Sequence, residues 1–398
     1  MVLASALGLL KGLLLANLLG ATEFGYYGLV LLVVQFGLPL SSWGLLNALN
    51  NRLPIALGRR QPASADLIKR SLGAQIGTLL ITCGIYLAIV SHADSLPPDV
   101  RIALMLAAAT TALLSLSEFY VLVLRVERRI LPLAFLCLLR AGLALAAAVT
   151  AAVFWDFRAV ILCELVGLLV ALVIAQRTWL AEVRPHWPAW EEAVTLIRFG
   201  LPLMISNLIV IGTFTIDRLF VASALPDQYG QYAFASLIVI GWMAAVAMLN
   251  QTVAPQLLFE HGAGLGVREI ARRSWRITLV GAGLGLVGLG ILFPLSQSLA
   301  SSAFDNYGPG LDAMVILYIG GLVSLLAFPG FVAHALRPSY ALAAAGLAST
   351  VAIVGGLVLV QSEPTLNAFA WLFVASQAVA TLGAWIGVAV VARRRVDA

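Results

Sequence analysis

Charged residues are scarce in this sequence of 398 residues, at 11%, whereas 61% of the residues are hydrophobic. Soluble domains carry about 25% charged and roughly 45–50% apolar residues. The chain therefore lacks the polar side chains that would cover a soluble domain, and its composition predicts an integral membrane protein. Its long apolar runs favour transmembrane helices of about 20 residues over the alternating segments of about ten residues that build outer-membrane barrels.

Motifs of several enzyme and metalloprotein classes are also missing. The three cysteines, Cys83, Cys137 and Cys163, lie in apolar runs, so we expect packing residues and no disulfide framework. No spacing of Cys or His is typical of a metal site, and we expect no metal, no cofactor and no nucleic-acid partner. The ATP-binding pattern G-x-x-x-x-G-K-[ST] is absent. Residues 283–288 match G-x-G-x-x-G, but inside an apolar run they indicate close helix packing.

The apolar runs predict an all-α polytopic membrane protein with about twelve transmembrane helices. The first run lacks an A-x-A-like cleavage site before a polar domain, so we interpret it as a transmembrane helix and not as a signal peptide. The runs cover roughly residues 1–19, 26–47, 71–91, 101–122, 131–153, 159–176, 199–224, 232–252, 276–296, 312–335, 339–360 and 367–391.

Basic residues cluster after every second run, as Arg125, Arg128 and Arg129 do after the fourth, while the alternate loops are mostly acidic. By the positive-inside rule these basic loops and both termini are predicted to be cytoplasmic. The longest loop, residues 177–198, carries three tryptophans. Because tryptophan favours the headgroup layer, we expect this loop to lie along the inner membrane surface as a linker.

A weak internal repeat appears when the sequence is shifted by 205 residues. Phe24-Gly25-x-Tyr27 then falls on Tyr229-Gly230-x-Tyr232. Six runs separate the copies, which predicts two six-helix bundles of parallel topology, residues 1–176 and 199–398, related by a pseudo-two-fold axis along the membrane normal. The alternative is chance, because Gly permits a turn and Tyr anchors the interface in any helical hairpin.

Four stretches resemble a known family. "LLGATEFGYYGLVLLV" and "FGLPLMISNLIVIGTFTIDRLFVASALPDQYGQYAFA" are similar to the span 1–2 and span 7–8 hairpins of the polysaccharide transporter (O-antigen flippase) family, in the multidrug/oligosaccharidyl-lipid/polysaccharide exporter superfamily. "LRVERRILPLAFLCLLRAGLAL" and "AFDNYGPGLDAMVIL" look like its span 4–5 junction and span 9–10 loop. The resemblance implies a flippase of the bacterial inner membrane that works by alternating access of two bundles. Its cargo would be an undecaprenyl-pyrophosphate-linked oligosaccharide for surface polysaccharide such as the O antigen of lipopolysaccharide. Polymerase and glycosyltransferase partners of the same pathway are implied as well.

Three other functions stay open. A cation-coupled multidrug exporter of the same superfamily is disfavoured because the first run contains no Asp, and a cationic membrane interior favours an anionic cargo. A polytopic sugar ligase or polymerase would need a sizeable periplasmic loop with basic or His chemistry, and the outer loops are short and mostly acidic. A purely scaffolding role leaves the interior charges unexplained.

Arg140 is the sharpest single candidate for a cargo contact. It lies nine residues beyond Leu131, about 14 Å into the membrane. An Arg near the bilayer centre costs roughly 2.5–3.5 kcal/mol, so it needs an aqueous cavity or a partner. A guanidinium pairs bidentately with phosphate oxygens, which makes a phosphate or sugar-acid contact one interpretation. An internal ion pair that only joins helices is the other.

Lys11, Asp217 and Arg218 are the remaining cargo candidates. The repeat places Lys11 opposite Ile216, at the depth of the Asp-Arg pair. Neighbouring residues of a helix point about 100° apart, so Asp217 and Arg218 are not expected to face one direction. An interhelical salt bridge, or snorkelling of Lys11, is the structural alternative.

Glu164 and Glu118 are candidates for coupling an ion to transport. Both carboxylates lie within apolar runs, where burial favours their protonated form. The structural alternative is a pair with an Arg or contact with the membrane interface.

Overall fold

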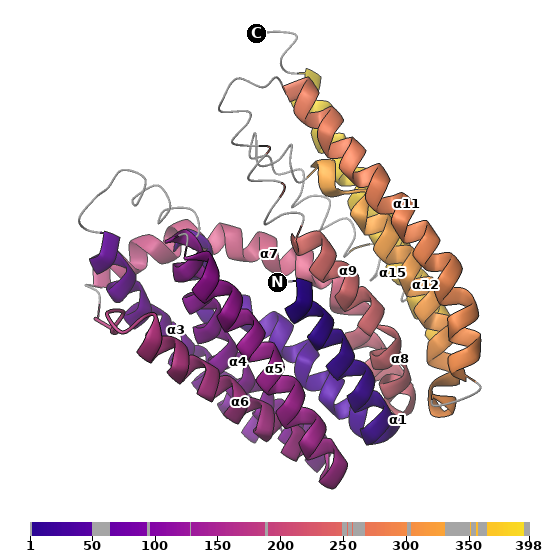
Figure 1. The fold of residues 1–398 in the computed structure, drawn as a ribbon, viewed down its shortest axis with the longest axis horizontal. Coiled ribbons are helices and arrows are strands. Elements are labelled where there is room, and N and C mark those ends of the chain that lie inside the picture. Colours follow the sequence, from indigo (N-terminus) through magenta and orange to yellow (C-terminus); the bar gives the residue numbers. More distant parts are fainter. Residues whose placement is uncertain are drawn as a thin grey trace. The chain divides into compact units, whose positions relative to one another are not determined.

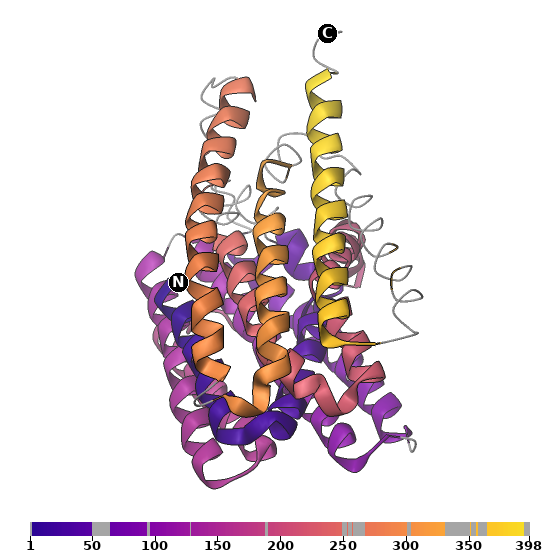
Figure 2. The same cartoon turned by 90° about the vertical axis from the view of Figure 1, so that its right-hand side faces the viewer.

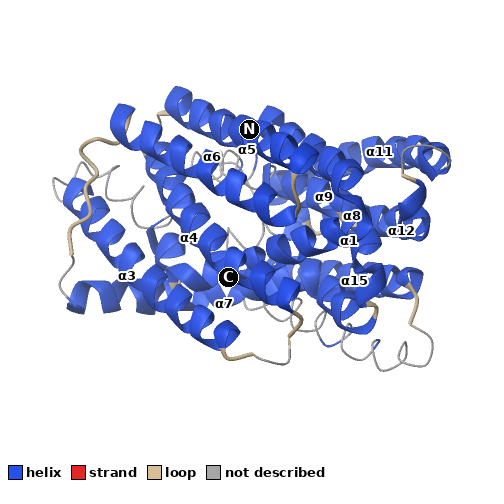
Figure 3. Cartoon of the chain, turned by 90° about the horizontal axis from the view of Figure 1, so that it is seen from below, coloured by secondary structure: helices blue, strands red, loops and turns tan. Residues whose placement is uncertain are grey.

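The computed structural model describes most of the chain, and within these residues every regular element is a helix (Figure 3). This confirms the all-helical class. The described residues fall into two compact units, Met1–Leu208 (unit 1) and Ile209–Ala398 (unit 2). The residues that the structure describes are 2–49, 64–93, 96–127, 129–187, 190–248, 253, 257, 267–300, 304–330, 351, 356 and 364–393.

Nine helices of the described part are long and apolar enough to cross a membrane. One of these candidates, Leu3–Ser42, belongs to α1 (Val2–Ser42), which breaks at Gly20, where φ is 73°. The break divides α1 into two apolar segments that match the first two predicted runs. The predicted run 339–360 lies almost wholly outside the described residues. The total of about twelve helices therefore stays a prediction.

Unit 1 packs the two segments of α1 against the helices that follow. These are α3 (Ser64–Ser91), α4 (Pro98–Val126), α5 (Ile130–Phe154) and α6 (Phe157–Thr178). The contacts join α1 to α4 and α5, α3 to α4, and α5 to α6 (Figure 1).

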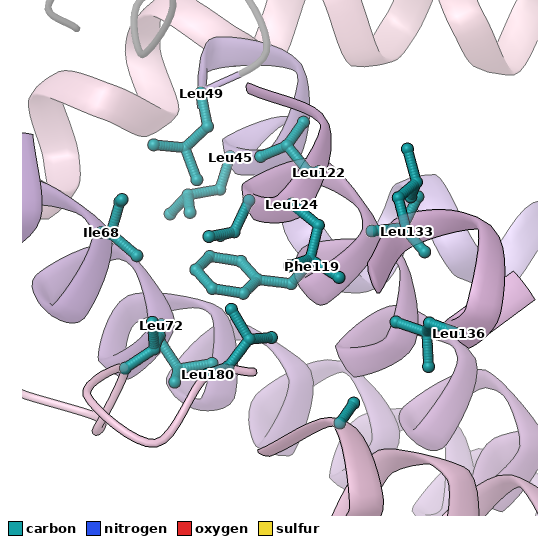
Figure 4. Packing of buried hydrophobic residues seen from close by; sticks show 14 of the residues in the cluster. Leu45, Leu49, Ile68, Leu72, Phe119, Leu122, Leu124, Leu133, Leu136 and Leu180 are labelled. Atoms are coloured by element: carbon teal, nitrogen blue, oxygen red, sulfur yellow. The ribbon is translucent and has the colours of Figure 1, made fainter. Parts of the chain in front are cut away.

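One end of unit 1 holds an apolar core around Phe119 of α4. Its ring is fully buried among Leu45, Ile68 and Leu124 (Figure 4). Lipid tails are as apolar as this core, so within the bilayer close packing stabilises it more than the hydrophobic effect does. The exposed apolar side chains follow the same logic: Leu80 on α3 is 64% exposed, as suits a lipid-facing surface.

A close backbone contact joins the end of the α1 hairpin to α7 (Trp190–Ala224) within unit 1. A Cβ atom on Gly44 would overlap the backbone of Gly200, and one on Gly200 would overlap the backbone of Gly44. Trp43 and Gly44 both have positive φ, 47° and 82°, so the chain turns sharply here. Only glycine satisfies both the turn and the contact at position 44. Helix α7 then continues past Pro202 into unit 2.

Unit 2 is centred on α12 (Gly308–Leu325), which packs against α8 (Tyr229–Ala235), α9 (Leu237–Met248), α11 (Val267–Ala300) and α15 (Leu366–Arg393). Figure 2 shows α11, α12 and α15 as neighbouring rods. Short 3-10 turns, η1 (Pro226–Gln228) and η3 (Asp305–Tyr307), precede α8 and α12.

The glycine-rich stretch 283–288 lies inside α11 and serves helix packing. A Cβ atom on Gly285 would overlap Leu322, and one on Gly288 would overlap the hydroxyl of Tyr318. That hydroxyl donates a hydrogen bond to the carbonyl oxygen of Gly285 at 2.9 Å. The close approach of α12 thus needs these glycines. The expectation of close helix packing is confirmed for this stretch.

The segment between α6 and α7 is anchored to unit 1 by its backbone. Nε2 of Gln176 donates to the carbonyl oxygen of Leu180 at 3.0 Å. The backbone N–H of His186 donates to the carbonyl oxygen of Lys69 at 3.1 Å. Such bonds satisfy backbone groups that the loop leaves outside helices. The place of the predicted linker 177–198 at a membrane surface stays a prediction.

Candidate functional site

The first charge cluster joins Lys11, Tyr27 and Glu164 in unit 1. Lys11 lies in the first segment of α1, Tyr27 in the second, and Glu164 on α6. Nζ of Lys11 is 2.9 Å from Oε1 of Glu164, and the hydroxyl of Tyr27 donates to the same oxygen at 3.0 Å. The Lys11 and Glu164 side chains are 16% and 15% exposed. A charge in apolar surroundings needs such partners, so the cluster ties both arms of the hairpin to α6.

A second contact fixes the same hairpin to the beginning of α6. Oε2 of Glu23 accepts a hydrogen bond from the backbone N–H of Phe157 at 3.0 Å. The first N–H groups of a helix have no partner within the helix, and an acid there also suits the helix dipole. Asp156 caps the same turn by accepting from the N–H of Ala159 at 3.2 Å. Glu23 therefore holds the hairpin in register with Glu164.

The second charge cluster consists of Asp217 and Arg218 on α7 and Tyr232 on α8, in unit 2. The Tyr232 hydroxyl donates to Oδ2 of Asp217 at 2.7 Å. Asp217 and Arg218 are only 2% and 4% exposed, and Tyr232 is fully buried. Among the described residues, Oδ1 of Asp217 and Nε and Nη2 of Arg218 have no hydrogen-bond partner. Buried charged groups are seldom left in this condition, so the cluster is a candidate ligand site.

The shift by 205 residues aligns the tyrosines of the two clusters. Tyr27 falls on Tyr232, and in each unit that tyrosine donates to a carboxylate. The turns before them align as well. The α1 break at Gly20 falls on Leu225, where the chain leaves helical geometry after α7.

The charged partners of these tyrosines are not equivalent by the same shift. Glu164 falls on Phe369, and Asp217 falls on Gly12. Each cluster therefore contains one cation, one carboxylate and one tyrosine, and only the tyrosine occupies the repeated position.

Arg140 on α5 is paired with α4. Its Nη1 donates to Oγ of Ser117 and to Oε1 of Glu118, each at 2.9 Å. The Arg140 and Glu118 side chains are 28% and 41% exposed. The contacts agree with the internal ion pair that the sequence left open as an alternative. A cargo role for Arg140 and a coupling role for Glu118 stay predictions.

The sequence identified the six charged candidates but not their partners. The pairs of Lys11 with Glu164 and of Arg140 with Glu118 were not predicted, nor was either tyrosine as a partner. The recurrence of Tyr27 and Tyr232 was the available signal. Within the described part of the chain, no three side chains of His, Cys, Asp or Glu gather closely enough to hold a metal ion.

Comparison with known proteins identifies a sequence family. A family model described as polysaccharide biosynthesis protein matches residues 14–258, which is more than half of the chain. This agrees with the resemblance found in the hairpin sequences. No curated protein matches the chain significantly.

Solved structures show the fold. The chain is similar to an inward-facing multidrug resistance MATE family transporter of the MOP superfamily, with a TM-score of 0.72 and 15% identity over 98% of this chain and 94% of that one. An outward-facing structure of such a transporter has a TM-score of 0.69, 13% identity, and coverage of 99% and 93%. A point mutant of the Vibrio cholerae MATE transporter VcmN has a TM-score of 0.65, 15% identity, and coverage of 99% and 94%.

Proposed function

Because the chain belongs to the polysaccharide biosynthesis protein family, we propose that it is a secondary transporter that flips a lipid-linked oligosaccharide across the membrane. The cargo carries undecaprenyl pyrophosphate and moves from the cytoplasmic to the periplasmic leaflet of the bacterial inner membrane, for surface polysaccharide such as O antigen. The similar solved structures are transporters, which supports a transporter and not an enzyme.

The second charge cluster carries the proposal. A guanidinium that is 4% exposed, with two nitrogen atoms lacking a partner in the described chain, is costly inside an apolar membrane protein. Pyrophosphate oxygens are the partners that a guanidinium matches best. An anionic cargo therefore explains Arg218 better than a cationic drug does.

The charged candidates have three different roles in this proposal: cargo binding, charge neutralisation in the resting state, and ion coupling. Arg218 and Lys11 each offer a cation to the phosphates of the cargo, and Asp217 is the counter-ion of the resting state. Arg140 contacts phosphate or sugar acid after release from Glu118. Glu164 and Glu118 are the carboxylates through which an ion couples to transport, since each forms an ion pair with a cation in the structure.

Alternating access of two six-helix bundles is the proposed mechanism. Two observations support it: the aligned turns at Gly20 and Leu225, and the occurrence of this fold in both inward-facing and outward-facing transporter structures. We place both termini in the cytoplasm, by the charge of the loops. Polymerase and glycosyltransferase partners would act before and after the flipping step.

The test is the lipid-linked intermediate in a strain that lacks this protein. We expect the intermediate to accumulate on the cytoplasmic leaflet, and mass spectrometry of its glycan would identify the sugars. Restoration of the gene should clear it. Normal surface glycan in the deletion strain, together with increased sensitivity to cationic drugs, would instead support a multidrug exporter.

A further inference from the structure

We propose that Tyr27 and Tyr232 are positioning residues that hold the carboxylates of the two charge clusters while the neighbouring cations bind the cargo. The inference rests on the proposed function, and it assigns a role to the repeated tyrosine that neither the family nor the fold supplies. In each cluster the tyrosine hydroxyl keeps its hydrogen bond to the carboxylate after the neighbouring cation has turned to a pyrophosphate oxygen.

Unit 1 shows the arrangement in which the carboxylate is shared. Oε1 of Glu164 receives both Nζ of Lys11 at 2.9 Å and the hydroxyl of Tyr27 at 3.0 Å. Nζ of Lys11 also lies 5.7 Å from the centre of the Tyr27 ring. If the lysine moves away from Glu164, the carboxylate therefore keeps one hydrogen bond, because the tyrosine hydroxyl donates to it independently.

Unit 2 shows the arrangement in which the tyrosine, and not the cation, donates to the carboxylate. The Tyr232 hydroxyl donates to Oδ2 of Asp217 at 2.7 Å, while Nε and Nη2 of Arg218 have no partner among the described residues. All three side chains are at least nine-tenths buried. The guanidinium is thus available to an anion, and Asp217 remains hydrogen-bonded.

In the proposed exchange, cargo phosphate replaces the carboxylate as the partner of the cation. This exchange requires a hydrogen-bond donor at the position of the tyrosine. Cargo phosphate that displaces a carboxylate from its cation leaves a buried negative charge, and such a charge is strongly unfavourable without a hydrogen bond. A phenol donates without adding positive charge, so it satisfies the carboxylate but does not compete with the cation for phosphate. Without the hydroxyl, the carboxylate must turn to the neighbouring cation, and cargo must compete with the carboxylate for that cation.

A packing role is the rival explanation, because both tyrosines are buried at a hairpin. It predicts that loss of the hydroxyl changes membrane abundance and leaves cargo affinity unchanged. The positioning role predicts the opposite, since the phenylalanine ring preserves the packing. It also predicts that neutralising the carboxylate removes the need for the tyrosine.

The experiment measures the Kd for undecaprenyl pyrophosphate with the full chain in lipid nanodiscs. We expect Tyr27→Phe and Tyr232→Phe to raise the Kd about tenfold or more, the usual effect of losing a hydrogen bond to a charged group. Tyr27→Phe combined with Glu164→Gln, and Tyr232→Phe combined with Asp217→Asn, should return the Kd to within about threefold of the parent. Equal weakening in the single and double variants would overturn the inference.

Two tyrosines outside the clusters are matched controls. Tyr26 packs its ring on Phe157 with the centroids 5.1 Å apart, and Tyr318 donates to a backbone carbonyl instead of a carboxylate. Tyr26→Phe and Tyr318→Phe should keep the parent Kd. An equal rise in these controls, or an unchanged Kd in Tyr27→Phe and Tyr232→Phe, contradicts a specific positioning role.

If a tyrosine variant fails to accumulate, infrared difference spectra of the unsubstituted protein test the inference instead. Addition of undecaprenyl pyrophosphate should shift carboxylate bands that Glu164→Gln and Asp217→Asn remove. Binding without such a shift overturns the exchange and leaves the proposed function standing. A parent protein that does not bind undecaprenyl pyrophosphate refutes the proposed cargo itself, and the inference with it.

Discussion

Arg140 lies about 15 Å along α5 from Ile130, at a depth where a free guanidinium is costly. Hydrogen bonds from Arg140 to Ser117 and Glu118 offset part of that cost. Both side chains of the ion pair remain partly exposed, so the pair contributes less than a buried one. A partly open ion pair can exchange its carboxylate for another anion at low cost.

The first prediction concerns this pair. Arg140→Ala should reduce export of surface glycan about tenfold or more at normal membrane abundance, because a charge-assisted contact to cargo is lost. Arg140→Lys should restore export only in part, since a point charge replaces the planar fork. Export assays and immunoblots of membranes measure both. Arg140→Ala with Glu118→Gln removes the ion pair in neutral form, and full export by this double variant would show that the pair is structural.

Substitutions of Asp217 and Arg218 can separate an effect on protein stability from an effect on cargo export, because both side chains are almost completely buried. Asp217→Asn leaves a buried guanidinium without its nearby negative charge, and breaking one partner of a buried pair typically costs about 3–5 kcal/mol. Arg218→Gln in the same chain should recover the abundance. We expect that Asp217→Asn with Arg218→Gln accumulates but does not export, as measured by membrane protein level and surface glycan. A neutral double variant that exports like the parent would place cargo recognition elsewhere, with Arg140 the next candidate.

The charged candidates could be predicted because each stands out against an apolar run, whereas their partners could not. Lys11 and Glu164 are 153 residues apart in the chain, and their contact depends on the rotation of two helices about their axes. An apolar run specifies that a helix crosses the membrane, but with lipid on one side and protein on the other it says little about rotation. The tyrosines were missed as partners because Tyr at a hairpin also suits an interface anchor.

The apolar runs predicted where the described helices lie in the sequence, but they did not predict where those helices begin and end. Helix α7 begins at Trp190 and α11 at Val267, each nine residues before the start of its predicted run. Apolar runs mark the part of a helix that lies in hydrocarbon, and charged turns such as Glu191-Glu192 extend it beyond. The sharp turn at Trp43 and Gly44 was also invisible, because the run 26–47 continues through it.

The contact of Gly44 with Gly200 gives a prediction for these elements. Gly44→Ala combines an unfavourable positive φ with overlap against the Gly200 backbone, so we expect a loss of about 1–3 kcal/mol or more. Gly200→Ala should destabilise by the overlap alone. Thermal unfolding in detergent measures both. Gly142→Ala on α5 is the control: nothing lies within 4 Å of its Cβ position, and a helical Ala is favourable. Parent-like stability of Gly44→Ala would mean that α7 does not approach this turn.

The prediction of two parallel halves depends on the number of membrane crossings between the two hairpin turns. From Gly20 to Leu225 the chain passes through the second segment of α1, then α3, α4, α5, α6 and the apolar part of α7. These six segments are apolar and long enough to span, so we expect six crossings, an even number that returns the chain to the same side. In the sequence this parity was indicated by the loop charges and by the six runs between the copies of the repeat, and the helices of the structure support the same expectation independently of charge.

The last prediction tests that parity directly. In a chain whose three cysteines have been replaced, single cysteines at the exposed Thr22 and Asp227 should both react with an impermeant maleimide added to intact cells. A cysteine at the exposed Arg184, one crossing away from Asp156 along α6, should react only after the inner membrane is opened. The same loop charges place residues 59, 128, 268 and 394 with Arg184, and residues 94, 156, 305 and 363 with Thr22. Labelling of Thr22 and Asp227 from opposite sides would make the repeat antiparallel.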